Sequence, residues 1–154
     1  MTYYDEISTG YNELYGKEQM EKWESAKRLT AIKGRVLDIG CGTGLITRKI
    51  ENCIGVDSSI KLLEQAENTV VCGYAEKLPF KSESFDTIIS FTALQDIKDV
   101  PSAVSELRRV LKKNGKILLS VLNKNKIKII REVLKKNFKE IKEKEIRKDI
   151  VFFT

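Results

Sequence analysis

Short runs of apolar residues alternate along the chain with longer, more polar stretches. The apolar runs predict buried strands over residues 36–39, 53–56, 69–73, 84–91 and 116–122. The stretches between them predict helices over residues 43–51, 60–68, 101–113 and 126–137. Strands that alternate with helices in this way are typical of an α/β protein with a mostly parallel sheet.

The N-terminal segment predicts a helical cap placed before this core. The cap is expected over residues 1–33, with its firmest helix at 17–32 and interruptions at Gly10 and Gly16. At the other end of the chain, residues 138–153 are expected to form an antiparallel pair of strands.

Length and composition narrow the class of protein. The chain has 154 residues and a mass of 17.6 kDa, which fits one domain with a core of its own. No apolar run approaches the ~20 residues of a membrane span. Residues 1–10 carry acids and tyrosines rather than a basic-then-apolar signal pattern. We therefore expect a cytoplasmic protein without a membrane span.

The reactive side chains exclude several kinds of chemistry. Histidine is absent, which removes Ser-His-Asp and Cys-His catalysis and the commonest metal ligand. The three cysteines match neither a disulfide framework nor a zinc pattern, so we expect reduced thiols and no metal site. The net charge of +6 is concentrated in residues 112–148, which indicates either a solvated helix face or an RNA-binding surface.

One stretch carries the most specific chemistry. The first predicted strand ends at Asp38 and is followed at once by glycines at alternate positions, Gly40, Gly42 and Gly44. Such a loop turns sharply and lets a ligand approach the main chain, and the helix expected after it points free N–H groups at the same place. A carboxylate at this position suits a cationic ligand group and would repel a phosphate.

This stretch, Val-Leu-Asp-Ile-Gly-Cys-Gly-Thr-Gly at 36–44, resembles the first motif of the class I S-adenosylmethionine-dependent methyltransferases. It differs from the dinucleotide fingerprint G-x-G-x-x-G, which disfavours a nicotinamide dehydrogenase. The resemblance implies S-adenosylmethionine as cofactor. It places the loop residues Gly40, Cys41, Gly42 and Gly44 under the methionine part, whose ammonium Asp38 helps to hold.

The next strand end predicts a second carboxylate of the cofactor site. Asp57 follows the strand at 53–56 and is placed to accept hydrogen bonds from both ribose hydroxyls, with Ser58 beside it. A purely structural role, as a helix cap before Ser58 and Ser59, is the alternative.

The segment 73–80 resembles the family's G-D-A-E-x-L-P-F motif, with Tyr74 in place of the usual aspartate. The resemblance implies that the Ala75 N–H meets the adenine ring and that Glu76 supplies the carboxylate, or that none is supplied. Adenine recognition is thus where the sequence departs from its family.

The resemblance also indicates where the methyl group is transferred. The strand ending at Phe91 should border it, and Asp96 stands where the family often has histidine. The N-terminal tyrosines Tyr4 and Tyr11 match a cofactor-capping pattern of methyltransferases of the menaquinone/ubiquinone-biosynthesis type. Packing of the cap onto the sheet is the alternative for them. Tyr11 and Asp96 are the candidate catalytic groups.

Together these features predict a three-layer, Rossmann-like α/β sandwich with a mostly parallel seven-stranded sheet and an antiparallel C-terminal strand. It forms a single methyltransferase domain over 1–154, with the cap at 1–33 and the α/β core at 34–154. The leading functional hypothesis is methyl transfer to a small-molecule acceptor. The alternatives are an RNA or protein substrate, with a small activator subunit as partner, and a cofactor-binding module without activity.

Overall fold

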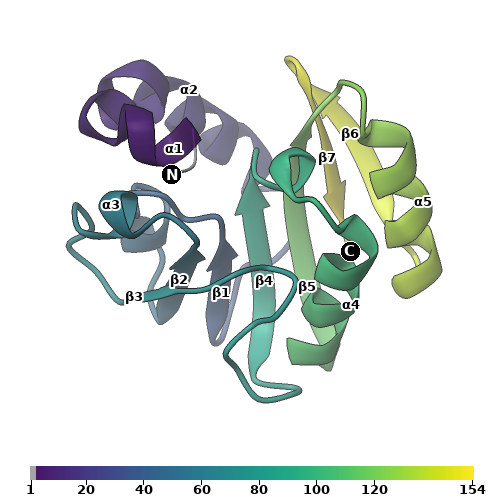
Figure 1. The fold of residues 1–154 in the computed structure, drawn as a ribbon. Coiled ribbons are helices and arrows are strands. Elements are labelled where there is room, and N and C mark those ends of the chain that lie inside the picture. Colours follow the sequence, from purple (N-terminus) through teal and green to yellow (C-terminus); the bar gives the residue numbers. More distant parts are fainter. Residues whose placement is uncertain (1–2) are drawn as a thin grey trace.

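A seven-stranded sheet runs through the middle of the molecule, with helices on both of its faces (Figure 1). The computed structural model describes residues 3–154, so residues 1 and 2 of the predicted cap lie outside the described part. The strands are β1 (Val36–Ile39), β2 (Cys53–Asp57), β3 (Val70–Cys72), β4 (Phe85–Phe91), β5 (Leu111–Leu122), β6 (Lys142–Ile146) and β7 (Asp149–Phe153). Their order is β3-β2-β1-β4-β5-β7-β6. β1 to β5 pair in parallel and β7 is antiparallel to both its neighbours, which confirms the predicted fold class.

The helices fall into a cap and a core set. They are α1 (Tyr3–Ile7), α2 (Tyr11–Ala26), α3 (Ile60–Leu63), α4 (Val100–Val110) and α5 (Ile127–Asn137), with short 3-10 turns η1 (Ser8–Gly10), η2 (Thr47–Lys49) and η3 (Leu94–Asp96). Within residues 3–154 no helix combines the length and the apolar character needed to cross a bilayer.

The core lies on both faces of the sheet because every central strand is buried on both sides. Ile88 of β4 belongs to a cluster shared with α4 and α5, whereas its neighbour Ile89 belongs to a cluster shared with α2. In that second cluster Trp23 of α2 packs edge-on against Phe91, with ring centroids 5.8 Å apart. The cap helix α2 is therefore one of the three layers (Figure 1).

Two expectations for the cap were wrong. The helix begins at Tyr11 instead of residue 17, and Gly16 does not interrupt it. Gly16 is buried inside α2, where an added Cβ would lie 3.3 Å from a methyl carbon of Leu45. The glycine thus lets the helix approach the segment that follows β1, and the helix gains more from packing than it loses in propensity.

The helices of the core are shorter than predicted. The helix expected at 43–51 is only the turn η2, because too few residues separate Gly44 from Cys53 for a helix and a return to β2. The helix expected at 60–68 keeps only the four residues of α3. α4 ends at Val110 because Leu111 is already extended and pairs with Phe85 at the start of β5.

A buried ion pair attaches α2 to the C-terminal strand β7. Lys22 Nζ lies 3.2 Å from Asp149 Oδ1, and both residues are buried. Lys22 Nζ also donates to Thr92 Oγ1 at 3.1 Å, and Ser120 Oγ donates to Asp149 Oδ2 at 2.5 Å. Thr92 has a positive φ of 57°, which non-glycine residues seldom adopt, so this network holds a strained residue at the end of β4.

We expect Asp149→Asn to lower the free energy of unfolding by about 3–5 kcal/mol, because it leaves the Lys22 ammonium buried without its counter-charge. The double variant Lys22→Met/Asp149→Asn should recover much of that loss. Glu18→Gln is the matched control, since the exposed Glu18 carboxylate is 3.4 Å from the same ammonium and should contribute under about 1 kcal/mol. Urea unfolding measures all three, and equal effects of Glu18→Gln and Asp149→Asn would contradict the burial argument.

Candidate functional site

A cavity of about 700 Å³ opens at the carboxyl ends of β1, β2 and β4. This is the edge at which open α/β sheets bind their ligands. The structure brings together in its walls most of the residues singled out from the sequence, namely Tyr4, Tyr11, Gly40, Asp57, Ser58, Ala75, Glu76, Phe91 and Asp96.

A second cavity, of about 20 Å³, lies under the glycine loop and shares Tyr11, Gly40 and Phe91 with the large one. Its walls include Asp38 and Cys41. A space of this size accommodates roughly one water molecule or a small polar group. The two predicted carboxylates therefore line different cavities, Asp38 the small one and Asp57 the large one. Gly40 of the glycine loop lies in the walls of both cavities.

The glycine loop has the backbone that its sequence indicates. Gly40, Gly42 and Gly44 all have positive φ angles. At Gly40 an added Cβ would lie 2.4 Å from the Cβ of Ala93, so a side chain there would collide with the segment after β4. Gly42 and Gly44 line neither cavity. They contribute through the positive φ angles that set the path of the loop.

Asp57 holds this loop in place. Its Oδ2 accepts the N–H of Gly42 at 2.8 Å and its Oδ1 accepts the N–H of Ser59 at 2.8 Å. Burial raises the pKa of this carboxyl, and the two backbone hydrogen bonds act in the opposite direction. A carboxylate has about four acceptor positions, so Asp57 keeps capacity for the cavity that it lines.

Asp38 is the most buried carboxyl of the site. It is 3% exposed, and Thr47 Oγ1 donates to its Oδ2 at 2.7 Å. Burial raises its pKa to about 7, opposed by the Thr47 hydrogen bond and reinforced by the nearby charge of Asp57. A cation beside Asp38 would lower this pKa again, since an opposite charge stabilises the ionised carboxylate.

The cap closes over the loops that carry these carboxylates. Ser59 Oγ donates to Asp5 Oδ1 at 2.5 Å, and Thr43 Oγ1 donates to Asn12 Oδ1 at 2.6 Å. These contacts fix α1 and α2 above the large cavity.

The candidate catalytic groups lie at the cap end of the cavity. Tyr4 Oη donates to Asp96 Oδ2 at 2.5 Å, joining α1 to the turn η3. Burial, and then the hydrogen bond to Asp96, hold the pKa of Tyr4 well above its usual range. Burial raises the pKa of Tyr11 to about 12. Both phenols are therefore protonated at neutral pH and can donate a hydrogen bond but do not accept a proton.

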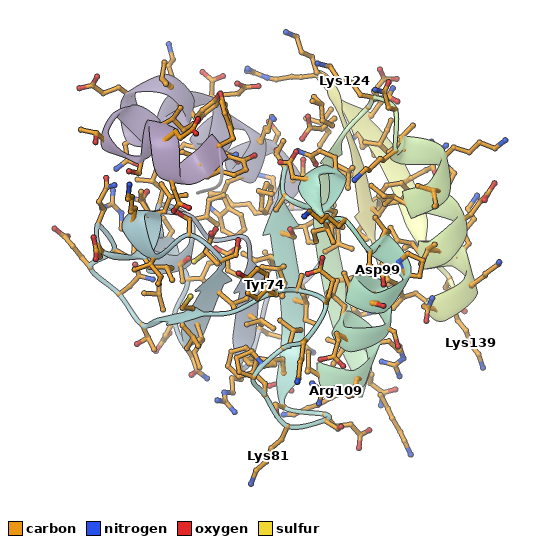
Figure 2. The ribbon with its side chains drawn as sticks, viewed as in Figure 1. Tyr74, Lys81, Asp99, Arg109, Lys124 and Lys139 are labelled. Carbon is orange, nitrogen blue, oxygen red and sulfur yellow. The ribbon has the colours of Figure 1, made fainter. Side chains whose placement is uncertain are left out.

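The residue that departs from the family motif sits at the rim. Tyr74 lines the cavity yet is 65% exposed, on the segment that follows β3 (Figure 2). Ala75 and Glu76 line the same wall. A side chain this exposed is not needed for the core, so its substitution should cost little stability.

Sequence reasoning missed Gln19. Its Oε1 atom is buried without a hydrogen-bond partner among residues 3–154, and the residue lines the small cavity with Asp38. Gln19 follows Tyr11 and Tyr15 at four-residue steps, so all three share one face of α2. That signal was present in the sequence, but the interruption expected at Gly16 concealed it. Tyr3 and Lys98 of the large cavity were also not singled out, whereas Thr92, expected beside the methyl group, does line it.

Residues 37–119 match the model of the methyltransferase domain family. With this match, the strand order and the glycine loop between two carboxylates, the chain belongs to the class I S-adenosylmethionine-dependent methyltransferases. This family is broader than the menaquinone/ubiquinone type that the N-terminal tyrosines resemble. S-adenosylmethionine is the cofactor of the class.

Three known proteins illustrate what the chain is similar to. It is 40% identical over 147 residues to MJ1252, an uncharacterized protein of Methanocaldococcus jannaschii, covering 91% of this chain and 59% of that one. It is 38% identical over 103 residues to a malonyl-[acyl-carrier protein] O-methyltransferase of Erwinia pyrifoliae, covering 61% and 39%. The fold matches the chain solved in complex with the Haloferax volcanii Trm112 methyltransferase activator, with a TM-score of 0.86, 14% identity and coverage of 97% and 94%. The chain thus spans about three fifths or less of the two curated relatives.

Proposed function

We propose that the protein transfers a methyl group from S-adenosylmethionine to a small-molecule acceptor bound in the large cavity. The observation that carries this proposal is the pair of neighbouring cavities that share the wall residues Tyr11, Gly40 and Phe91, with Asp57 in one and Asp38 in the other. The volume of about 700 Å³ lies in the range of pockets that hold a small molecule. The proposal treats the cap and the α/β core as one catalytic domain.

The residues present fit this cofactor. The small cavity combines the buried carboxyl of Asp38 with the unpartnered buried Oε1 of Gln19, two acceptors that an ammonium group would satisfy. Asp57 would accept the ribose hydroxyls with its remaining lone pairs, beside Ser58. The Ala75 N–H and the Glu76 carboxylate would meet the adenine, with the exposed ring of Tyr74 at its edge.

The cofactor supplies an activated methyl group on a sulfonium, which already leaves readily. The protein then has to bind the two substrates, orient them and exclude water. In-line positioning of the acceptor and the methyl group supplies much of the catalysis. Phe91 and Tyr11 stand in the walls of both cavities, so they would border the transferable group. Gly40 permits the close approach of the loop to Ala93 that a Cβ would block.

We expect S-adenosylhomocysteine, the demethylated product, to bind the protein, and NAD not to bind. A pyrophosphate would meet the carboxylates of Asp38 and Asp57, whereas an ammonium and a ribose are complementary to them. Calorimetry with the two ligands measures this directly. NAD binding without a response to S-adenosylhomocysteine would refute the proposed function.

The variant Gln19→Leu sharpens the same experiment. It should lower the affinity for S-adenosylhomocysteine about tenfold, because it removes an acceptor for the ammonium group. It should not lower stability, because that acceptor is unpartnered in the free protein. Lys17→Met, at an exposed position of the same helix, is the control. If Gln19→Leu binds as tightly as the parent, Gln19 has no part in the site.

One observation favours a second acceptor class, RNA or an RNA-associated protein. Residues 123–148 hold eleven lysines and arginines against four glutamates. The net charge of this segment is therefore larger than the +6 of the whole chain. Figure 2 shows two of these lysines, Lys124 and Lys139, projecting outward near opposite ends of α5. The similar fold that was solved with Trm112 adds the proposal of a small activator subunit. Salt-dependent binding of bulk tRNA would support this alternative.

Incubation with labelled cofactor and cell extract separated into small molecules, RNA and protein distinguishes the candidates. Label in the small-molecule fraction supports the proposal, and label in RNA or protein supports the alternative. Binding of S-adenosylhomocysteine without transfer to any fraction would indicate a cofactor-binding module.

A further inference from the structure

We infer that the acceptor is an amine, held at the cap end of the large cavity by the Asp96 carboxylate and the rings of Tyr3, Tyr4 and Tyr11. This inference rests on the proposed function and names the substrate class of the same site. All four residues line the cavity.

The charge of the cavity walls is opposite to that of the protein. The chain carries a net charge of +6, yet the ionisable wall residues other than tyrosine are Asp57, Glu76, Asp96 and one lysine, Lys98. Asp57 and Glu76 lie toward β2 and β3, on the side assigned to the cofactor. Asp96 is the carboxylate left for the acceptor, and it would repel a carboxylate or phosphate placed beside it.

Asp96 is oriented, and part of its hydrogen-bonding capacity remains. Tyr4 Oη occupies Oδ2 at 2.5 Å, whereas Oδ1 has no hydrogen-bond partner within residues 3–154. The Tyr4 phenol therefore fixes the rotation of the carboxylate from one side. An amine or ammonium N–H donor fits the acceptor that remains, since a charge-assisted hydrogen bond is stronger than a neutral one.

The tyrosine that contacts this carboxylate, Tyr4, belongs to a cluster of tyrosine rings. The rings of Tyr3 and Tyr4 meet edge-on with centroids 5.5 Å apart, and those of Tyr4 and Tyr11 with centroids 6.2 Å apart. Tyr3 is 59% exposed, and its Oη lies 3.0 Å from Tyr15 Oη, so its ring stands at the edge of the cavity. Ring faces beside a carboxylate are the recurring means of binding organic cations, each contributing about 0.5–2 kcal/mol.

The acid–base groups favour nitrogen over oxygen as the attacked atom. Tyr4 and Tyr11 are protonated at neutral pH, so neither can remove a proton from a hydroxyl acceptor. An amine acceptor is bound as its ammonium form and must first release one proton to water, after which the neutral nitrogen carries a free lone pair and the transfer itself needs no protein base. The amine nitrogen forms a bond to the methyl carbon while the carbon–sulfur bond breaks, and the electron pair of that bond stays on sulfur. The new methylated ammonium is the product, and it exchanges its proton with water after release.

The test uses two sets of molecules that differ only in the reacting group, with the protein saturated with S-adenosylhomocysteine. One set is 2-phenylethylamine, 2-phenylethanol and phenylacetate, and the other is butylamine, butanol and butanoate. Calorimetric titration should show each amine binding at least tenfold more tightly than its alcohol or carboxylate. Asp96→Asn should reduce this preference to under threefold and leave the affinity for S-adenosylhomocysteine within twofold. Glu132→Gln, on the exposed face of α5, is the matched control and should change neither.

Two outcomes would overturn the inference. The amines bind no better than their alcohols, or do not bind, while S-adenosylhomocysteine still binds. Alternatively, Asp96→Asn leaves the preference for amines intact. Loss of S-adenosylhomocysteine binding in the parent protein would instead refute the proposed function, so the two failures are distinguishable.

Discussion

Replacement of Asp57 by alanine is expected to lower the affinity for S-adenosylhomocysteine at least tenfold and to lower the stability of the fold at the same time. The affinity falls because hydrogen bonds to a charged acceptor contribute about 1.5–3 kcal/mol each, and about 1.4 kcal/mol is one decade in the dissociation constant. The stability falls because the N–H groups of Gly42 and Ser59 lose their partner. We expect a loss of about 2–4 kcal/mol in the free energy of unfolding, measured by urea denaturation alongside calorimetry.

Two companion variants separate the roles of Asp57. Asp57→Asn keeps one oxygen acceptor without the charge and should fall between the parent and Asp57→Ala in both measurements. Ser58→Ala, at the neighbouring wall position, should leave stability close to that of the parent. An unchanged affinity for S-adenosylhomocysteine in Asp57→Ala would leave Asp57 with only its structural role.

The affinity for S-adenosylhomocysteine is expected to fall about tenfold as the pH is lowered from about 8 to about 6. In the free protein burial raises the pKa of Asp38 to about 7, so the carboxyl is mostly ionised at the higher pH and mostly protonated at the lower. An ammonium beside it favours the ionised form, so binding releases a proton near neutral pH and weakens as the pH falls. Calorimetry in buffers of different ionisation enthalpy measures the released proton.

Asp38→Asn provides the control for this pH dependence, since the pKa of Asp57 is raised as well. The variant should bind more weakly at pH 8, with a flatter pH profile. It should also be more stable than the parent by about 1–3 kcal/mol at that pH. The folded parent retains a proton that the unfolded chain releases above about pH 4, so Asp38 reduces stability increasingly up to about pH 7. A pH-independent affinity in the parent would place the ammonium elsewhere.

Local sequence was sufficient for the sheet and for the residues at its carboxyl edge. The central strands β1, β4 and β5 contain short, mostly apolar runs, as burial on both faces favours, although buried polar residues such as Thr87 and Ser90 interrupt them. The positive φ angles of the glycine loop follow from residue type, because only glycine adopts them without strain. Asp38 and Asp57 could be assigned to the site because each directly ends such a strand.

The helix boundaries could not be obtained in this way. Intrinsic propensity predicted a break at Gly16 and a continuation of α4 toward Asn114, and packing reversed both. Gly16 lies against Leu45, and Leu111 pairs with Phe85, so in each case the partner is distant in sequence. A propensity of up to about 1 kcal/mol per residue is smaller than the energy of such contacts.

The sequence by itself thus determined where the core strands lie along the chain, the glycine loop and the two carboxylates, because each depends on neighbouring residues. Only the tertiary structure decided that α2 is a layer of the fold, that Gln19 lines the same small cavity as Asp38, and that Lys22 pairs with Asp149. It also placed Tyr4 on Asp96. These contacts join residues far apart in the chain, and a long-range contact leaves no periodic signal in either of its segments.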